Sequence, residues 1–173
     1  LRDAIKEVRS ISMGLRPSML DDLGLVATLG WFCREFEALY PPVSIKKRIE
    51  LEEFEIPDVL KIVVFRIVQE ALNNIRKHSE ANVARIMIRR LDNGRLQILI
   101  EDDGIGLKQN SNKAKPGEQI GLNSMKERAS RIKADYTLES EPGEGTRIIL
   151  EFAEQKVEEK HPSVKIETSF NLT

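Results

Sequence analysis

Several common features are scarce or missing in this chain of 173 residues. Cys33 is the single cysteine, so no disulfide can form within the chain, and a reducing compartment suits the sequence. No apolar run approaches the length of a membrane-spanning helix, and no signal peptide opens the sequence. Lysine and arginine number 27 against 28 aspartate and glutamate residues, so the basic excess of a nucleic-acid-binding protein is absent. We expect a cytoplasmic chain, which leaves open a membrane-anchored parent protein.

Two common nucleotide-binding glycine motifs are also missing. Gly104 and Gly106 form an isolated G-x-G that is followed by a polar stretch and not by a helix, which does not fit a dinucleotide-binding turn. No G-x-x-x-x-G-K-[ST] sequence occurs either. Any nucleotide site in this chain is therefore of another kind.

The first forty residues predict two helices. Residues 1–15 carry an amphipathic stripe that a short helix cannot bury alone, and a partner helix is expected; its members are Leu1, Ala4, Ile5, Val8, Ile11 and Leu15. Because this pattern is already in progress at Leu1, we expect the chain to come from a longer protein. Gly14 and Pro17 end this helix, and Asp21 or Asp22 is expected to cap a second helix that runs to about Tyr40.

The order of the remaining elements predicts the fold. Alternation and turn signals indicate strands at 43–51, 83–91, 95–101, 136–139 and 146–152, with helices from about 57 to 78 and from 121 to 132. Asn93-Gly94 is a strong hairpin signal, and the polar stretch 108–119 predicts a mobile loop. We therefore expect an α/β two-layer sandwich, with a mixed, mainly antiparallel sheet and helices on one face. Residues 25–152 form its domain, 1–24 precede it, and 153–173 form a polar tail.

The long helix carries two distinct strips. Its apolar stripe predicts the buried face and consists of Leu60, Val63, Val64, Ile67, Ala71 and Ile75. On the shoulder of that stripe lie Glu70, Asn74, Lys77 and His78, which either form an ordinary polar flank or line a pocket. The opposite positions are expected to be solvated; these are Arg66, Gln69, Asn73 and Arg76.

Three separated segments together suggest a nucleotide site. Asp102 ends a predicted strand, where its carboxylate can accept a hydrogen bond from an exocyclic amine, and Gly104 and Gly106 allow a ligand to approach the backbone. The amides of Gly121-Leu122 are expected to open a helix and to hold phosphates. The amide oxygen of Asn74 is a hard ligand suited to Mg²⁺.

These segments resemble the sequence boxes of bacterial sensor histidine kinases. The stretch 70–78 (EALNNIRKH) resembles their N-box, 102–106 (DDGIG) their G1 box, 121–129 (GLNSMKERA) their G2 region, and 143–146 (GEGT) their last glycine-threonine turn. The Lys-His ending of the first box and the stretch from Leu15 to Leu25 resemble the subclass that pairs with nitrate-response-type regulators.

The resemblance implies the Bergerat ATP-binding fold, with ATP and Mg²⁺ as cofactors. It implies that Asn74 ligates Mg²⁺, that Asp102 holds the adenine amino group, and that Thr146 supports Asp102 through a water. Lys77 and His78 would then lie near the phosphates. Glu70 would polarise the phosphoacceptor. The ATP-binding residues implied are Asn74, Lys77, His78, Asp102, Gly104, Gly106, Gly121, Leu122 and Thr146.

The phosphoacceptor histidine of such kinases has no counterpart here. The chain contains only His78, within the N-box, and His161, in the polar tail. We therefore interpret residues 1–24 as the end of the dimerisation and phosphoacceptor hairpin, and 25–152 as the catalytic domain. Implied partners are that helical hairpin and a downstream response regulator, with a homodimeric parent protein and a monomeric fragment. A non-enzymatic ATP-dependent interaction module and an anti-sigma-type serine kinase are the alternatives on the same fold.

Overall fold

The computed structural model describes residues 18–107 and 116–153. The helical elements are α2 (Met19–Leu39), the 3₁₀ turn η1 (Glu53–Glu55), α3 (Asp58–Asn74), the π-helical turn η2 (Ile75–Ser79) and α4 (Pro116–Arg131). The strands are β1 (Ser44–Ile49), β2 (Val83–Arg90), β3 (Leu96–Asp102), β4 (Asp135–Ser140) and β5 (Thr146–Phe152). The described residues include no helix that is long and apolar enough to cross a membrane.

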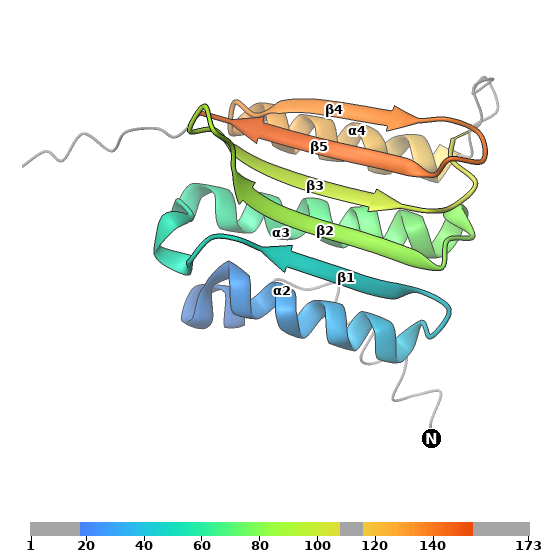
Figure 1. Cartoon of the computed structure of the whole chain (residues 1–173), viewed down its shortest axis with the longest axis horizontal. Helices are drawn as coiled ribbons and strands as arrows, with labels where there is room; N and C mark the ends of the chain where they lie inside the picture. Colours follow the sequence, from blue (N-terminus) through green and yellow to red (C-terminus); the bar gives the residue numbers. More distant parts are fainter. Residues whose placement is uncertain (1–17, 108–115, 154–173) are drawn as a thin grey trace, which may run out of the picture.

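The five strands form one sheet in the order β1-β2-β3-β5-β4. Only the β1–β2 pair is parallel; the other neighbours are antiparallel. The helices lie behind one face of this sheet (Figure 1). The β2–β3 hairpin turns at Gly94, whose positive φ of 80° is readily adopted by glycine. The predicted mixed, mainly antiparallel α/β sandwich is confirmed.

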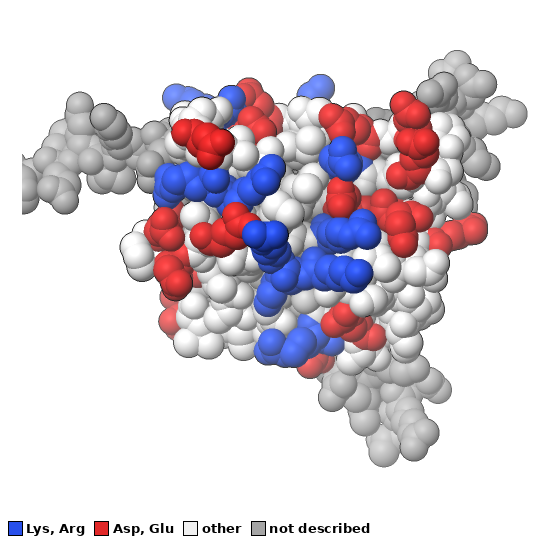
Figure 2. Space-filling model, viewed as in Figure 1, with Lys and Arg blue, Asp and Glu red and all other residues white. Residues whose placement is uncertain are grey.

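The open face of the sheet carries charges of both signs. Across one row of the strands, Arg85 pairs with Glu101 at 3.3 Å, Glu101 with Arg147 at 3.1 Å, and Arg147 with Glu139 at 3.3 Å. Figure 2 shows acidic and basic side chains interleaved over this face. Opposite charges directly across neighbouring strands favour this register.

Helix α3 is buried on two sides because it packs against the sheet and against α2. Phe65 meets the Phe32 ring of α2 edge-on, with 5.4 Å between centroids. On the same side Gln69 is buried and accepts a hydrogen bond of 2.8 Å from Arg66. The prediction that this face of α3 is solvated is therefore wrong at Gln69. The polar residues of α3 mark this side as exposed, but α2 covers it. Arg76, near the far end, stacks over the Tyr40 ring at 4.7 Å.

Helix α2 is interrupted at Gly24, which has φ 81° and ψ −174°. The backbone N–H groups of Leu25 and Val26 follow this break, and each donates a 2.9 Å hydrogen bond to the Glu53 carboxylate of η1. Lys61 contacts the same carboxylate at 2.8 Å. The predicted cap by Asp21 or Asp22 is therefore wrong at this helix start: a carboxylate from another element takes that role.

Candidate nucleotide-binding site

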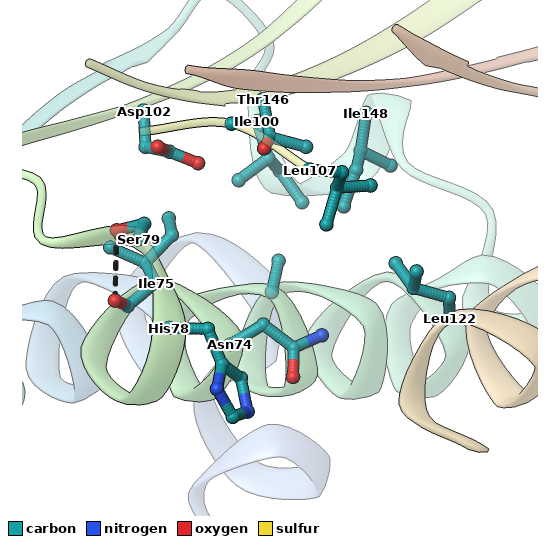
Figure 3. Close-up of a pocket in the computed structure, with 12 residues that line it drawn as sticks. Asn74, Ile75, His78, Ser79, Ile100, Asp102, Leu107, Leu122, Thr146 and Ile148 are labelled. Atoms are coloured by element: carbon teal, nitrogen blue, oxygen red, sulfur yellow. Dashed lines mark hydrogen bonds between the residues drawn. The ribbon is translucent and has the colours of Figure 1, made fainter. Parts of the chain in front are cut away.

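A cleft opens between α3 with η2, the ends of β3 and β5, and α4 (Figure 3). It contains about 500 Å³ of space, part of it open to solvent. The lining residues are Ala71, Asn74, Ile75, His78, Ser79, Ile100, Asp102, Gly106, Leu107, Leu122, Thr146 and Ile148. An apolar wall with a few polar groups is typical of a small-molecule site.

Asp102 is the buried carboxylate of this cleft, with 8% of its surface exposed. It is the last residue of β3 and lies opposite Thr146 in the ladder with β5. Its Oδ1 accepts a 2.9 Å hydrogen bond from the N–H of Gly104. Burial raises the pKa of Asp102, and the N–H of Gly104 partly offsets that rise. Both Asp102 and Thr146 lie on the sheet side of the cleft (Figure 3).

Asp103, the next residue, has a structural role. Its exposed carboxylate accepts hydrogen bonds from the backbone N–H groups of Val83, at 2.8 Å, and Asn82, at 2.9 Å. The bond from Val83 is the largest cause of a lowered pKa for Asp103. The two adjacent aspartates therefore differ: one fixes the start of β2, and the other faces the cleft.

Gly104 and Gly106 pack against protein backbone. A Cβ atom at Gly104 would overlap the carbonyl oxygen of Ser79, and one at Gly106 would overlap that of Glu141. Gly106 also has a positive φ of 67° and lines the cleft, whereas Gly104 lies just behind Asp102. Besides any approach of a ligand, these glycines allow the turn after β3 to close onto the neighbouring backbone.

Gly145 and Gly143 give a prediction about stability, in which Gly143 is the control for Gly145. Gly145 has φ 81°, and an added Cβ would overlap the carbonyl oxygen of Asp102; Gly143 has φ 86° but nothing within 4 Å of that position. Gly143→Ala is expected to cost about 1–2 kcal/mol, the penalty of a left-handed backbone alone. Gly145→Ala should lower the free energy of unfolding by roughly twice as much or more, because the backbone must also move. Urea denaturation measures both; equal losses would contradict the predicted overlap.

The helix side of the cleft presents Asn74 and His78 (Figure 3). The Nδ2 atom of Asn74 is buried and makes no hydrogen bond to the described residues. A π-helical turn follows Asn74, and π-turns occur frequently at functional sites. Ser79 closes this turn by donating a 2.8 Å hydrogen bond to the carbonyl oxygen of Ile75.

Two predicted residues of the same helix lie outside the lining. Lys77 is exposed on η2. Glu70 is half-buried and faces Gly121 of α4, where its Oε1 fills the place that a Cβ at Gly121 would take. Asn74 Nδ2 lies 3.4 Å from that same place. Helix α4 therefore approaches α3 closely at Gly121, which brings Glu70 and Asn74 against it.

Gly121 and Leu122 do not open a helix. Helix α4 begins at Pro116, so both residues lie in its second turn, where backbone amides are normally bonded to carbonyl groups one turn earlier. The prediction that free backbone amides at Gly121-Leu122 bind the phosphates is therefore wrong. Proline is well suited to a first helical turn, and Pro116 extends the helix into the stretch expected to be loop. Leu122 still lines the cleft. Residues 108–115 of the expected mobile loop lie outside the described residues.

Several lining residues were not predicted as part of the site. The apolar ones, Ala71, Ile75, Ile100, Leu107 and Ile148, read in the sequence as ordinary core or turn positions. Ser79 directly follows the N-box and carried no separate signal. Alternation within a strand could have placed Ile100 and Asp102 on one face, since they lie two residues apart.

The residues present fit an adenine nucleotide with Mg²⁺. A buried carboxylate at one wall suits an amino group, and apolar side chains suit the faces of a purine. The described residues contain no group of three or more His, Cys, Asp or Glu side chains that could hold a metal ion. Mg²⁺ is commonly held by few protein ligands together with substrate phosphates and water. When bound, the ion would neutralise phosphate charge, and Asn74 would be its candidate protein ligand.

Comparison with known proteins identifies the family. Residues 60–156 match the family model of the histidine kinase-, DNA gyrase B-, and HSP90-like ATPases. The chain is 35% identical over 150 residues to the signal transduction histidine-protein kinase/phosphatase DegS of Brevibacillus brevis, covering 87% of this chain and 38% of DegS. It is 32% identical over 148 residues to the oxygen sensor histidine kinase NreB of Staphylococcus carnosus (strain TM300), covering 85% of this chain and 41% of NreB.

Solved structures with low sequence identity share the fold. The histidine kinase domain of the Erythrobacter litoralis EL346 blue-light activated histidine kinase gives a TM-score of 0.59 at 18% identity, over 74% of this chain and 60% of that one. The Acinetobacter baumannii histidine kinase AdeS gives 0.56 at 11% identity, over 79% and 72%.

The chain belongs to the histidine kinase-, DNA gyrase B-, and HSP90-like ATPase family, and within it to the ATP-binding catalytic domains of sensor histidine kinases. It spans about two fifths of the length of the curated relatives it matches.

Proposed function

We propose that this chain binds Mg-ATP in the cleft and transfers the γ-phosphoryl group to a histidine on a separate helical hairpin. The observation that carries the proposal is the buried Asp102 carboxylate, which faces Asn74 across an apolar cleft; the buried Nδ2 of Asn74 makes no hydrogen bond to the described residues. Asp102 accepts a hydrogen bond from the adenine amino group, with Thr146 supporting it through a water. Asn74 contributes one oxygen to Mg²⁺.

The phosphate end of the nucleotide lies toward the end of α3 and the start of α4. Lys77 and His78 supply positive charge and hydrogen-bond donors there, while Glu70 polarises the acceptor imidazole. Such phosphoryl transfer depends on positioning and charge neutralisation, so it needs few covalent roles from the protein. The phosphorylated hairpin then serves a response regulator. In this proposal the parent protein is a homodimer, this chain alone is a monomer, and the domain works in the cytoplasm, whether or not the parent is anchored in a membrane.

Asn74→Ala tests the metal site. Removing the amide oxygen deletes the protein ligand but leaves the adenine wall, so ATP affinity should become insensitive to Mg²⁺. Calorimetric titrations with and without Mg²⁺ measure this, and Asn73→Ala is the matched control, one position round the helix and outside the cleft lining. An equal Mg²⁺ enhancement in wild type and Asn74→Ala would remove Asn74 from the metal site.

Phosphoryl transfer itself is tested with labelled ATP and a separately supplied hairpin that bears the acceptor histidine. The hairpin should become labelled only when the chain is present with an intact Asp102. If the chain binds ATP but transfers no phosphoryl group, the result would contradict the kinase function and would favour the alternative, a non-enzymatic ATP-dependent interaction module.

A further inference from the structure

Ser140, the last residue of β4, joins two turns that border the cleft. Its hydroxyl accepts a 2.8 Å hydrogen bond from the backbone N–H of Leu107 and donates a 2.8 Å hydrogen bond to the carbonyl oxygen of Gly145. It also lies 3.2 Å from the hydroxyl oxygen of Thr146. Leu107 and Thr146 line the cleft, whereas Ser140 does not. A side chain outside the cleft therefore contacts two residues of its wall.

The strand register places Ser140 beside the adenine wall that we propose. Ser140 lies opposite Thr146 in the β4–β5 pair, and Thr146 lies opposite Asp102 in the β5–β3 pair. Because these three residues form one row across adjacent strands, their side chains point to the same face of the sheet. Figure 3 shows Asp102, Thr146 and Leu107 on the sheet side of the cleft. A change at Ser140 should therefore affect this side of the cleft.

The turn after β3 is bonded to the β4–β5 turn at two positions. The backbone N–H of Gly143 donates a 2.8 Å hydrogen bond to the carbonyl oxygen of Ile105, and this bond involves no side chain. Two residues further along the same turn, the N–H of Leu107 is bonded to the side chain of Ser140. A substitution at Ser140 can therefore remove the second bond and leave the first in place.

We propose that Ser140 is a positioning residue for nucleotide binding, because its hydroxyl holds Leu107 in place as part of the apolar wall of the cleft. Without that hydroxyl, the amide of Leu107 loses its acceptor and the turn after β3 can adopt more conformations. ATP binding must then order the turn, and the free energy of ordering weakens the affinity. This proposal rests on the function proposed above, since it requires the adenine ring to lie against the sheet side of the cleft.

Ser140→Ala should weaken ATP binding by roughly two- to tenfold, the effect expected for the loss of one hydrogen bond. Ser140→Thr keeps the hydroxyl, so its affinity for ATP should stay close to that of the wild type. Thr137→Ala is the matched control, because it removes a hydroxyl from the exposed face of the same strand, away from the cleft. Isothermal titration with ATP measures all three variants, and Thr137→Ala should match the wild type.

Two further measurements separate the positioning of the cleft wall from a general loss of structure. In Ser140→Ala without ATP, amide exchange measured by NMR should become faster at Leu107, while the amides paired within β3 and β5 keep their wild-type rates. In the assay with labelled ATP and a separate hairpin, the KM for ATP should rise by the same factor as the Kd. The kcat should stay unchanged, since Ser140 acts on the binding of the nucleotide and not on the transfer step.

The outcomes distinguish this proposal from the proposed function. If Asp102→Asn weakens ATP binding but Ser140→Ala does not, the positioning role is overturned and the proposed function stands. Equal losses in Ser140→Ala and Ser140→Thr would also overturn it, because the hydroxyl would not be the cause, and so would a fall in kcat at an unchanged KM. If Asp102→Asn leaves ATP affinity unchanged, the proposed function fails, and the role of Ser140 fails with it.

Discussion

Asp102→Asn is expected to weaken ATP binding by roughly 10- to 150-fold, the equivalent of about 1.5–3 kcal/mol for one hydrogen bond to a charged group. The carboxylate is buried at the end of β3, where it accepts a hydrogen bond from the N–H of Gly104. An asparagine amide can turn its NH₂ toward the adenine amino group, where two donors would face each other. Isothermal titration with ATP measures the loss.

The same variant should be at least as stable as the wild type. Because burial raises the pKa of Asp102 in the folded chain above its usual value, ionising this group disfavours folding. Its contribution to stability is most favourable below the unfolded-state pKa and is lost as pH rises through the folded-state pKa. At neutral pH the neutral amide of Asp102→Asn avoids that cost. The measurement is the urea midpoint of both proteins at neutral pH.

ATP affinity should also depend on pH through this group. In the wild type, affinity should fall as the pH drops through the raised pKa of Asp102, because the protonated carboxyl loses its negative charge. In Asp102→Asn this pH dependence of ATP affinity should be absent. Asp103→Asn is the matched control: it changes the neighbouring carboxylate, which bonds the start of β2, and should leave ATP affinity nearly unchanged. Wild-type affinity in Asp102→Asn would remove Asp102 from the adenine site.

The parts of this fold that are encoded locally could be predicted from the sequence. The Asn93-Gly94 turn and the alternation in its flanking strands define the β2–β3 hairpin with no information from elsewhere. The end of β3 follows from the same alternation, which places Asp102 at the cleft. The apolar stripe of α3 identifies its buried side: Leu60, Val64, Ile67, Ala71 and Ile75 are buried as predicted, and Val63 is only half-buried.

Two of the wrong predictions depend on a neighbour distant in the sequence, and the third depends on where a helix begins. Gln69 is polar and lies opposite the apolar stripe, yet α2 buries it. The amides after Gly24 bind Glu53, which lies 28 positions from Leu25. Gly121 reads as a helix start because a polar stretch precedes it, but α4 begins at Pro116, and Gly121 instead allows close approach to Glu70. Helical periodicity gives no information about which elements pack together.

Incubated alone with Mg-ATP, the chain is expected to incorporate no acid-labile phosphate. His78 lines the cleft from the π-helical turn η2, so its ring is held by a helical element, beside the phosphates in the proposed binding mode. To reach a position in line with the leaving group, it would have to unwind the turn that Ser79 closes onto Ile75. His161 lies outside the described residues and has no helical context in the sequence. Acid-labile label, measured before and after acid treatment, reports the result.

A hairpin that bears the acceptor histidine, added in trans, should become labelled, though slowly. Without a covalent link, the two parts meet by diffusion and lose the effective concentration, often millimolar, that a short tether supplies. Labelling should therefore rise with hairpin concentration and disappear with Asp102→Asn, while Asp103→Asn should retain it. His161→Ala should change neither result. Strong self-labelling that survives His161→Ala would contradict a catalytic domain that lacks its own acceptor, because His78 would then be the remaining acceptor histidine in the chain.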